Sequence, residues 1–181
     1  MRVLIFNGSL DMHPNSSAIN ISNYLSNQLK THGVDVEIFH LADAQIPFFN
    51  MAINSEEAAN MNNLFREADV HIWLTPLYHG GMTGIMKNCL DWLELSAKKE
   101  RPYLTNKVVG MICWSAGGHA MQGINAMESV AKALRAWTLP YSVPVMRNHL
   151  YEPGSAVFTK EYQQKFNLLI QLLLEAKQTL K

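Results

Sequence analysis

Hydroxyl and amide side chains are concentrated in a loop near the start of the chain, residues 7–18 (NGSLDMHPNSSA). Ser9 follows a short apolar run, and Asn15, Ser16 and Ser17 stand where a helical pattern begins. The unpaired amides and the dipole at the start of a helix suit a phosphate, and hydroxyl groups add donors. The alternative is that Ser16 or Ser17 only caps the helix. The GxxxxGK[ST] loop of nucleotide triphosphatases and the GxGxxG loop of dinucleotide-binding domains do not occur in this loop, which disfavours both classes.

A second loop, residues 75–84 (TPLYHGGMTG), carries two adjacent glycines and two ring side chains. Gly80 and Gly81 would let the backbone approach a flat ligand closely, while Tyr78 and His79 offer an aromatic face and a polar edge. The alternative is a plain turn, in which a glycine supplies a positive φ and His79 is an ordinary surface residue. No Ser or Cys partner in the sequence pattern marks His79 as the base of a nucleophile.

The third loop, residues 114–123 (WSAGGHAMQG), follows a nearly unbroken apolar run. Ser115 could donate a hydrogen bond to a carbonyl oxygen of a ligand. Gly117 and Gly118 leave the corner between a strand and a helix free of side chains. Exposed amides at such a corner could stabilise the negative edge of a ring.

Five apolar runs predict strands, and five segments of helical period alternate with them. The strands are expected at residues 3–6, 34–38, 70–75, 108–114 and 141–146. The helices are expected at residues 18–29, 56–68, 85–93, 124–134 and 166–174. This alternation predicts an α/β fold, a doubly wound five-stranded parallel sheet with helices on both faces. Trp73, Trp114 and Trp137 lie in apolar patterns and are predicted to belong to the core.

The predicted sheet brings the three loops together. In a doubly wound sheet, ligands bind outside the carboxyl ends of the strands, near the point where the strand order reverses. The loops after the first, third and fourth strands should meet there. One loop suited to a phosphate and two suited to a planar ring together indicate flavin mononucleotide (FMN) as the ligand.

Composition sets the class of protein. The 181 residues are expected to form a single domain, residues 1–181, large enough to need no metal or disulfide. The 15 basic and 15 acidic residues balance, so a general attraction to nucleic acid or to anionic lipid is not expected. Cys89 and Cys113 have no CxxC spacing, which predicts neither a disulfide nor a metal site. No apolar stretch approaches the about 18 residues of a membrane span, and the first apolar run is too short for a signal peptide. We therefore expect a cytoplasmic protein.

The chain resembles the flavodoxin-like, NAD(P)H-dependent FMN reductases, a family that includes quinone, azo-dye and chromate reductases. In the first loop the family reads approximately GSxRxxxN[ST], and this sequence has GSLD followed by NS at residues 15–16. The third loop, residues 115–118, is similar to the family's SxGGxxG. The second loop and the segment after it match the family pattern PxYxxSxPGxLKNxLDW, which is the most specific of the three. The matching residues there are Pro76, Tyr78, Gly84, Lys87, Asn88, Leu90, Asp91 and Trp92.

This resemblance implies a flavodoxin-like fold that binds FMN and takes electrons from NADPH or NADH. A hydride would pass from the nicotinamide through the bound FMN to a quinone, a free flavin, an azo compound or a similar small acceptor. Because one site would serve both half-reactions, ping-pong kinetics are expected, and no catalytic side chain is implied. A homodimer or homotetramer is implied as well.

Carried over residue by residue, the resemblance implies three groups of FMN-binding residues. The phosphate would be held by Ser9, Asn15, Ser16 and Ser17. The ribityl chain and the ring would lie along Pro76, Leu77, Tyr78, His79 and Gly80. The pyrimidine edge would meet Ser115, Ala116, Gly117 and Gly118. A further matching set is expected only to stabilise its helix or the contacts of that helix: Lys87, Asn88, Asp91 and Trp92.

Three positions depart from the family pattern. Asp11 stands where an Arg is usual and puts a negative charge beside the expected phosphate or pyridine-nucleotide site. It weakens the expectation of a strong NADPH preference, since a 2′-phosphate favours a nearby cation. Gly81 stands where a Ser is common, which removes a hydroxyl donor, and Ile85 replaces the common Leu.

Other functions stay open as alternatives. A flavodoxin-type electron carrier has a related fold but usually a TxTGxT loop and an acidic surface, and this sequence indicates neither. A receiver-type signalling domain would need acidic residues at the strand ends where Asn7 and Thr75 stand. A protein of the same family that binds FMN without turnover would show the same motifs.

Overall fold

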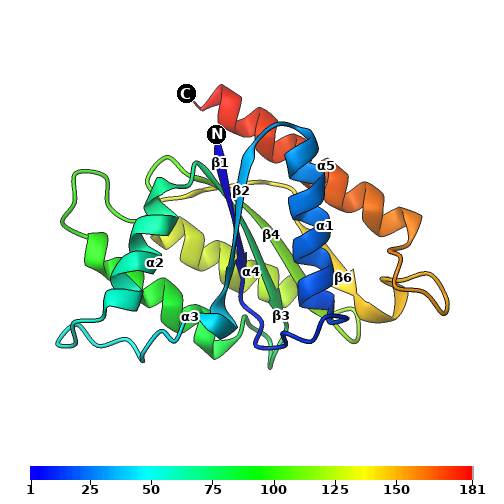
Figure 1. Ribbon diagram of the computed structural model, residues 1–181, viewed down its shortest axis with the longest axis horizontal. Coiled ribbons are helices and arrows are strands. Elements are labelled where there is room, and N and C mark those ends of the chain that lie inside the picture. The colour runs from blue at the N-terminus through cyan, green and yellow to red at the C-terminus, as the bar shows by residue number, and fades with distance from the viewer. Residues whose placement is uncertain (181) are drawn as a thin grey trace.

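Parallel strands and helices alternate along the chain in the computed structural model, which describes residues 1–180 (Figure 1). The strands are β1 Arg2–Asn7, β2 Asp35–His40, β3 Val70–Pro76, β4 Val108–Ser115, β5 Trp137–Thr138 and β6 Val143–Met146. The α-helices are α1 Ser17–Thr31, α2 Glu56–Glu67, α3 Gly84–Asp91, α4 Ala120–Ala133 and α5 Lys160–Thr179. Three short 3-10 helices complete the set: η1 Leu41–Asp43, η2 Trp92–Ser96 and η3 Arg147–His149.

The sheet has the order β2-β1-β3-β4-β5, and β6 also pairs with β4. Every pairing is parallel, with Val3 opposite Val36 on one side and opposite Val70 on the other. Helices α1 and α5 cover one face, while α2, α3 and α4 cover the other (Figure 1). The doubly wound, flavodoxin-like α/β fold expected from the sequence is therefore confirmed.

Each face of the sheet has its own core because side chains alternate along a strand. In β1, Val3 and Ile5 pack in the cluster under α1 and α5, whereas Leu4 and Phe6 pack in the cluster under α2, α3 and α4. All four are completely buried. The central strands read as continuous apolar runs for this reason, which is why their positions could be predicted.

The edge of the sheet differs from the prediction. The strand expected at residues 141–146 is confirmed as β6 from Val143 onward, and the short strand β5 at residues 137–138 was not predicted; both pair with β4. The Leu139 N–H still donates to the Val109 carbonyl at 2.9 Å, but Pro140, which follows, has no N–H to donate. Pairing resumes at Val143. Trp137, expected in the core, is instead 55% exposed because it lies on this short edge strand.

Trp73 and Trp114 are buried, as predicted. Within residues 1–180 the helices are too short or too polar to cross a membrane.

Candidate functional site

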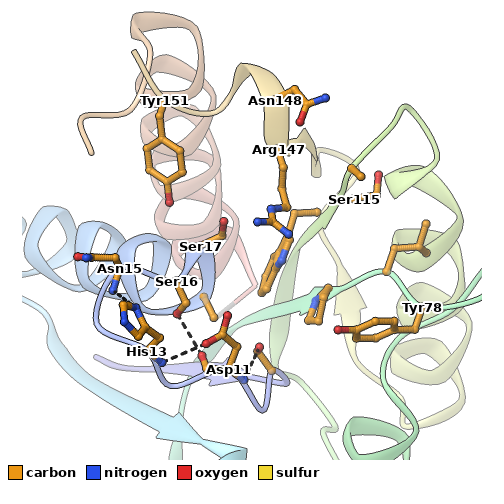
Figure 2. Close-up of a pocket in the computed structure, with 16 residues that line it drawn as sticks. Asp11, His13, Asn15, Ser16, Ser17, Tyr78, Ser115, Arg147, Asn148 and Tyr151 are labelled. Atoms are coloured by element: carbon orange, nitrogen blue, oxygen red, sulfur yellow. Dashed lines mark hydrogen bonds between the residues drawn. The ribbon is translucent and has the colours of Figure 1, made fainter. Parts of the chain in front are cut away.

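A cavity of about 720 Å³ lies at the carboxyl ends of β1, β3, β4 and β6 (Figure 2). It is where the strand order reverses, since the chain leaves β1 toward β2 and leaves β3 toward β4. The three loops selected from the sequence meet there. The expected residues that line the cavity are Ser9, Asn15, Ser16, Ser17, Pro76, Leu77, Tyr78, Ser115 and Ala116. The volume lies within the range of small-molecule and cofactor sites.

The first loop is wound by four successive side-chain-to-backbone hydrogen bonds. The Asn7 Oδ1 accepts the Ser9 N–H at 3.0 Å, and the Ser9 Oγ accepts the Asp11 N–H at 3.1 Å. The Asp11 Oδ1 accepts the His13 N–H at 3.1 Å, and the His13 Nδ1 accepts the Asn15 N–H at 3.2 Å. Each side chain thus holds the backbone two residues further on, which fixes the path of a loop without regular structure.

The loop ends at Ser16, which caps the amino end of α1. The Ser16 Oγ accepts the Ile19 N–H at 3.2 Å and donates to the Asp11 carbonyl at 3.1 Å. The helix-cap alternative is therefore correct for the Ser16 side chain. The N–H groups of Ser17 and Ala18, in the first turn, have no partner within the helix, and both residues line the cavity. A cap and an anion site can therefore coexist at this helix start.

Two opposite charges face the cavity. Among the described residues that line it, Arg147 carries the one guanidinium and Asp11 the one carboxylate. The Arg147 side chain comes from the end of β6 and extends into the cavity between Ser17 and Ser115 (Figure 2). Within residues 1–180, neither charge takes part in a salt bridge. The guanidinium in the cavity thus comes from the segment after β6, and not from the first loop, where Asp11 stands at the position of the family's usual Arg.

Arg147, Asn148 and Tyr151 were missed in the sequence analysis. They follow the last strand, whereas only the loops after the first, third and fourth strands were considered. The strand topology could have indicated them, because the carboxyl ends of all parallel strands lie on the same side of the sheet and the segment after the last strand must lie there too. The Tyr151 hydroxyl is fixed by the Asn20 amide, which donates to it at 3.1 Å.

The walls of the cavity are apolar on one side and open on another. Trp114 is 5% exposed, and Pro76 and Leu77 lie beside it because the Leu77 N–H donates to the Trp114 carbonyl at 2.8 Å. Tyr78 is 61% exposed at the rim, and Tyr151 stands on the opposite side (Figure 2). A planar ligand would find an apolar surface and aromatic side chains here.

His79 and Gly80 do not line the cavity; they form the tip of a tight turn. The Tyr78 N–H donates to the Gly81 carbonyl at 3.1 Å, and the Gly81 N–H donates back at 3.0 Å. His79 has φ 48° and Gly80 has φ 86°, the signs that a type I′ turn requires at its two central residues. The turn alternative therefore accounts for Gly80, and His79 is held in a left-handed conformation uncommon for a non-glycine residue.

Gly117 and Gly118 border a neighbouring cavity of about 280 Å³, beside Met146. A Cβ atom on Gly117 would meet no protein atom within 4 Å, and one on Gly118 would lie 3.8 Å from the Met146 Cε. Neither glycine has a positive φ. Packing and backbone conformation would thus tolerate a side chain here, so open space at this corner is the feature that glycine provides. The Ser115 hydroxyl donates to the Gly117 carbonyl and holds the corner in place.

The helix residues that match the family pattern have structural roles, as expected. The Lys87 ammonium pairs with Asp91 one turn along α3. The Asn88 amide and the Trp92 indole both donate to the Pro47 carbonyl, at 2.9 and 2.8 Å. These contacts hold the segment after η1 against α3 and η2. Within residues 1–180, no group of three or more His, Cys, Asp or Glu side chains is placed to hold a metal ion.

Comparison with known proteins identifies relatives of this chain. The profile of the family described as NADPH-dependent FMN reductase matches residues 1–149. The FMN-dependent NADPH-azoreductase of Staphylococcus aureus (strain USA300) is 31% identical over 150 residues, which cover 79% of this chain and 76% of that protein.

Solved structures share the fold at low sequence identity. The flavoenzyme NAD(P)H:(acceptor) oxidoreductase FerB of Paracoccus denitrificans is 17% identical, with a TM-score of 0.73 over 96% of this chain and 97% of that one. Oxidised flavodoxin 1 of Bacillus cereus is 11% identical, with a TM-score of 0.64 over 96% and 97% of the two chains.

Proposed function

The chain belongs to the NADPH-dependent FMN reductase family, and from this premise we propose that the cavity at the carboxyl ends of the strands is its FMN site. The protein is an FMN-dependent NAD(P)H oxidoreductase that acts on small-molecule acceptors. The observation that carries the site assignment is the convergence of two helix-start amides without a partner in the helix, a guanidinium and an apolar wall in one cavity.

The start of α1 suits the phosphate of FMN. Ser17 and Ala18 present the free amides of the first helical turn, where the helix dipole also favours a negative charge. Ser9 and Asn15, from the loop that leads into α1, also line the cavity. Arg147 supplies a positive charge opposite the helix start (Figure 2). We assign the phosphate to this group of residues.

The rest of the cavity suits the ring. Trp114, Pro76 and Leu77 exclude water from one wall, and Ser115 with the open corner at Gly117 offers polar contacts at the edge. When bound, FMN supplies two-electron chemistry between a nicotinamide and an acceptor. The task of these side chains is to bind and orient the reactants and to keep one face of the site dry.

We propose an azo compound or a quinone as the acceptor. The rim is formed by exposed Tyr78 and by Tyr151, which suit a flat aromatic molecule. The azoreductase relative, named for an azo acceptor, supports the first of these. Since donor and acceptor would use the same open face in turn, ping-pong kinetics are expected.

A homodimer is proposed as the assembly. The segment after η1 exposes apolar side chains, with Phe48 89%, Met51 56% and Ile53 45% exposed. Contiguous exposed apolar side chains mark interaction surfaces. Light scattering should give twice the chain mass of 20.5 kDa, and Phe48→Ser should lower it. A wild-type protein of single-chain mass would contradict this assembly.

A cytoplasmic location is proposed as well. Cys89 and Cys113 are both free and buried, and reduced thiols of this kind are typical of a reducing compartment.

The test is an anaerobic titration of the FMN-loaded protein, followed by visible absorbance. We expect NADPH or NADH to bleach the flavin and a quinone or azo dye to restore its colour. Bound FMN that dithionite reduces but neither nicotinamide does would favour the electron carrier or the non-catalytic binder instead. Failure to bind FMN would remove the site assignment.

A further inference from the structure

A further, positively charged cavity lies at the opposite end of the strands from the FMN cavity, where β3 and β4 begin. Its volume is about 210 Å³, and four of its lining residues are cations: Arg66, Arg101, Lys107 and Lys177. They come from the last turn of α2, from the segment before β4 and from the last turn of α5. We propose that this cavity binds a phosphate dianion, either free or as the terminal group of a phosphomonoester.

The cations outnumber the groups that could balance them. Asp69 is the only carboxylate among the described lining residues. Its Oδ2 already accepts the Arg2 N–H at 3.0 Å, and its Oδ1 lies 3.9 Å from the Lys177 Nζ. The carboxyl ends of α2 and α5 each contribute about half a negative charge. About two positive charges remain, and a phosphate dianion, with a charge of about −2, would balance them.

The donors of this cavity are incompletely used. The Arg66 Nε is buried and has no hydrogen-bond partner among the described residues. The Arg66 Nη2 reaches the Arg101 carbonyl only at 3.5 Å, and the Lys177 Nζ reaches the Asn106 carbonyl at 3.4 Å. A buried donor without a partner is costly. A ligand with several acceptor oxygens would satisfy these donors together.

The ammonium of Lys107 is affected by the same excess of positive charge. Burial lowers the pKa of its ammonium, and the positive charges of Lys177, Arg66 and Arg101 lower it further, against the opposing effect of Asp69. Like charges held close together on three separate elements repel one another, and an anion between them would relieve that repulsion. Thr105 also lines the cavity, but its hydroxyl already donates to the Pro102 carbonyl at 2.6 Å, so the cations supply the donors for the anion.

This cavity is separate from the proposed FMN site. Asp69 and Lys107 immediately precede β3 and β4, whereas Pro76 and Ser115 of the FMN cavity end those strands. Its volume also lies below the usual range for a cofactor as large as FMN. The ligand we infer is thus a phosphate group whose attached molecule, if any, extends into solvent, and its binding should not compete with FMN.

The experiment uses the FMN-saturated protein, so that the phosphate of FMN occupies its own site. Thermal unfolding is compared in sodium phosphate and in sodium chloride of equal ionic strength. At phosphate about ten times its Kd, we expect a rise in Tm of about 4 °C. The double variant Arg101→Gln with Lys177→Gln should lose this rise and keep the wild-type affinity for FMN.

A matched double variant controls for the general stabilising effect of phosphate on proteins. Lys30→Gln with Lys160→Gln removes the same charge from exposed positions outside the cavity and should keep the full rise. Glucose 6-phosphate tests for a phosphomonoester ligand, with glucose as the control for the sugar. A rise in Tm larger than that given by inorganic phosphate would indicate a phosphomonoester, and a smaller rise would indicate the free ion. An equal rise in all three proteins would overturn the proposal.

Chemical labelling of the wild-type protein gives a test that needs no variant. Acetylation of Lys107 and Lys177 should slow several-fold when phosphate is added, while that of exposed Lys30 should not change. Equal rates with and without phosphate at all three lysines would also overturn the proposal.

Discussion

Replacing Arg147 by Met should weaken FMN binding about tenfold. The substitution keeps an apolar stem and removes the one guanidinium among the described residues of the cavity. Two unit charges about 6 Å apart, at an effective dielectric constant of about 40, interact by about 1.4 kcal/mol. That energy corresponds to a factor of about ten in Kd. The guanidinium is exposed, so a dielectric constant between those of the protein interior and water applies.

Asp11→Asn is the complementary change in the same cavity. It removes the one carboxylate there, and its amide oxygen can still accept the His13 N–H that holds the loop. FMN affinity should therefore rise, by a factor of about three to ten, because the repulsion between two anions is lost. The pair of variants changes the cavity's charge in opposite directions while the loop and the strands stay as they are.

The assay is the quenching of FMN fluorescence on titration with apoprotein, at about 0.02 M and about 0.3 M salt. Both effects should shrink at the higher concentration, since salt screens exposed charges. Lys30→Met, an exposed cation away from the cavity, is the control and should leave Kd unchanged. An unchanged FMN Kd in both cavity variants would refute the phosphate assignment. A raised KM for NADPH with an unchanged FMN Kd would move Arg147 to the nicotinamide nucleotide.

Three further predictions concern stability and reactivity. Gly8→Ala should cost about 1–3 kcal/mol in chemical denaturation, because the new Cβ would lie 2.6 Å from the Met86 Sδ; an unchanged midpoint would show that Met86 moves aside freely. Cys89 and Cys113 should resist iodoacetamide at mildly alkaline pH in the native state and react in denaturant, because burial raises the pKa of each thiol to about 12. Burial, and then Lys107, lower the pKa of His71 from 6.5 to about 3, so the unfolded chain binds a proton that the folded one does not. The free energy of unfolding should fall by up to about 1.4 kcal/mol per pH unit as the pH drops from 6.5 toward 3, and His71→Gln should flatten that slope.

The sequence was sufficient to predict the central strands, where burial on both faces is the dominant signal. The central strands β3 and β4 are buried on both faces, so each reads as an apolar run that could be located directly. At the sheet edge formed by β5 and β6 the apolar pattern was a weaker guide, because Pro140 interrupts the pairing and Trp137 is exposed. An apolar run at a sheet edge does not by itself say which residues pair.

The site was predictable where its residues are neighbours in sequence. The turn from β1 into α1 is built from side-chain bonds between residues two to five apart, so Ser9 and Ser16 could be placed from the local pattern. Arg147 is 130 residues beyond Ser17, and its presence in the same cavity depends on where β6 ends. Only the strand order brings the two together. The negative charge of Asp11 was visible in the sequence, but the positive charge of Arg147 in the same cavity could not be predicted from the loop motifs.

Glycines show most clearly why a motif does not fix the role of its residues. Gly8, Gly80 and Gly117 follow three strands of one sheet, yet each lacks a side chain for a different reason. Gly8 is required by the packing of Met86, and Gly80 by a turn with φ 86°. Gly117 has neither constraint, since its missing Cβ would meet nothing within 4 Å. Open space alone does not single out a ligand site, since Gly81 and Gly84 are equally free of contacts. We propose the corner after β4 for the FMN ring because Ser115 and Ala116, which immediately precede Gly117, line the cavity.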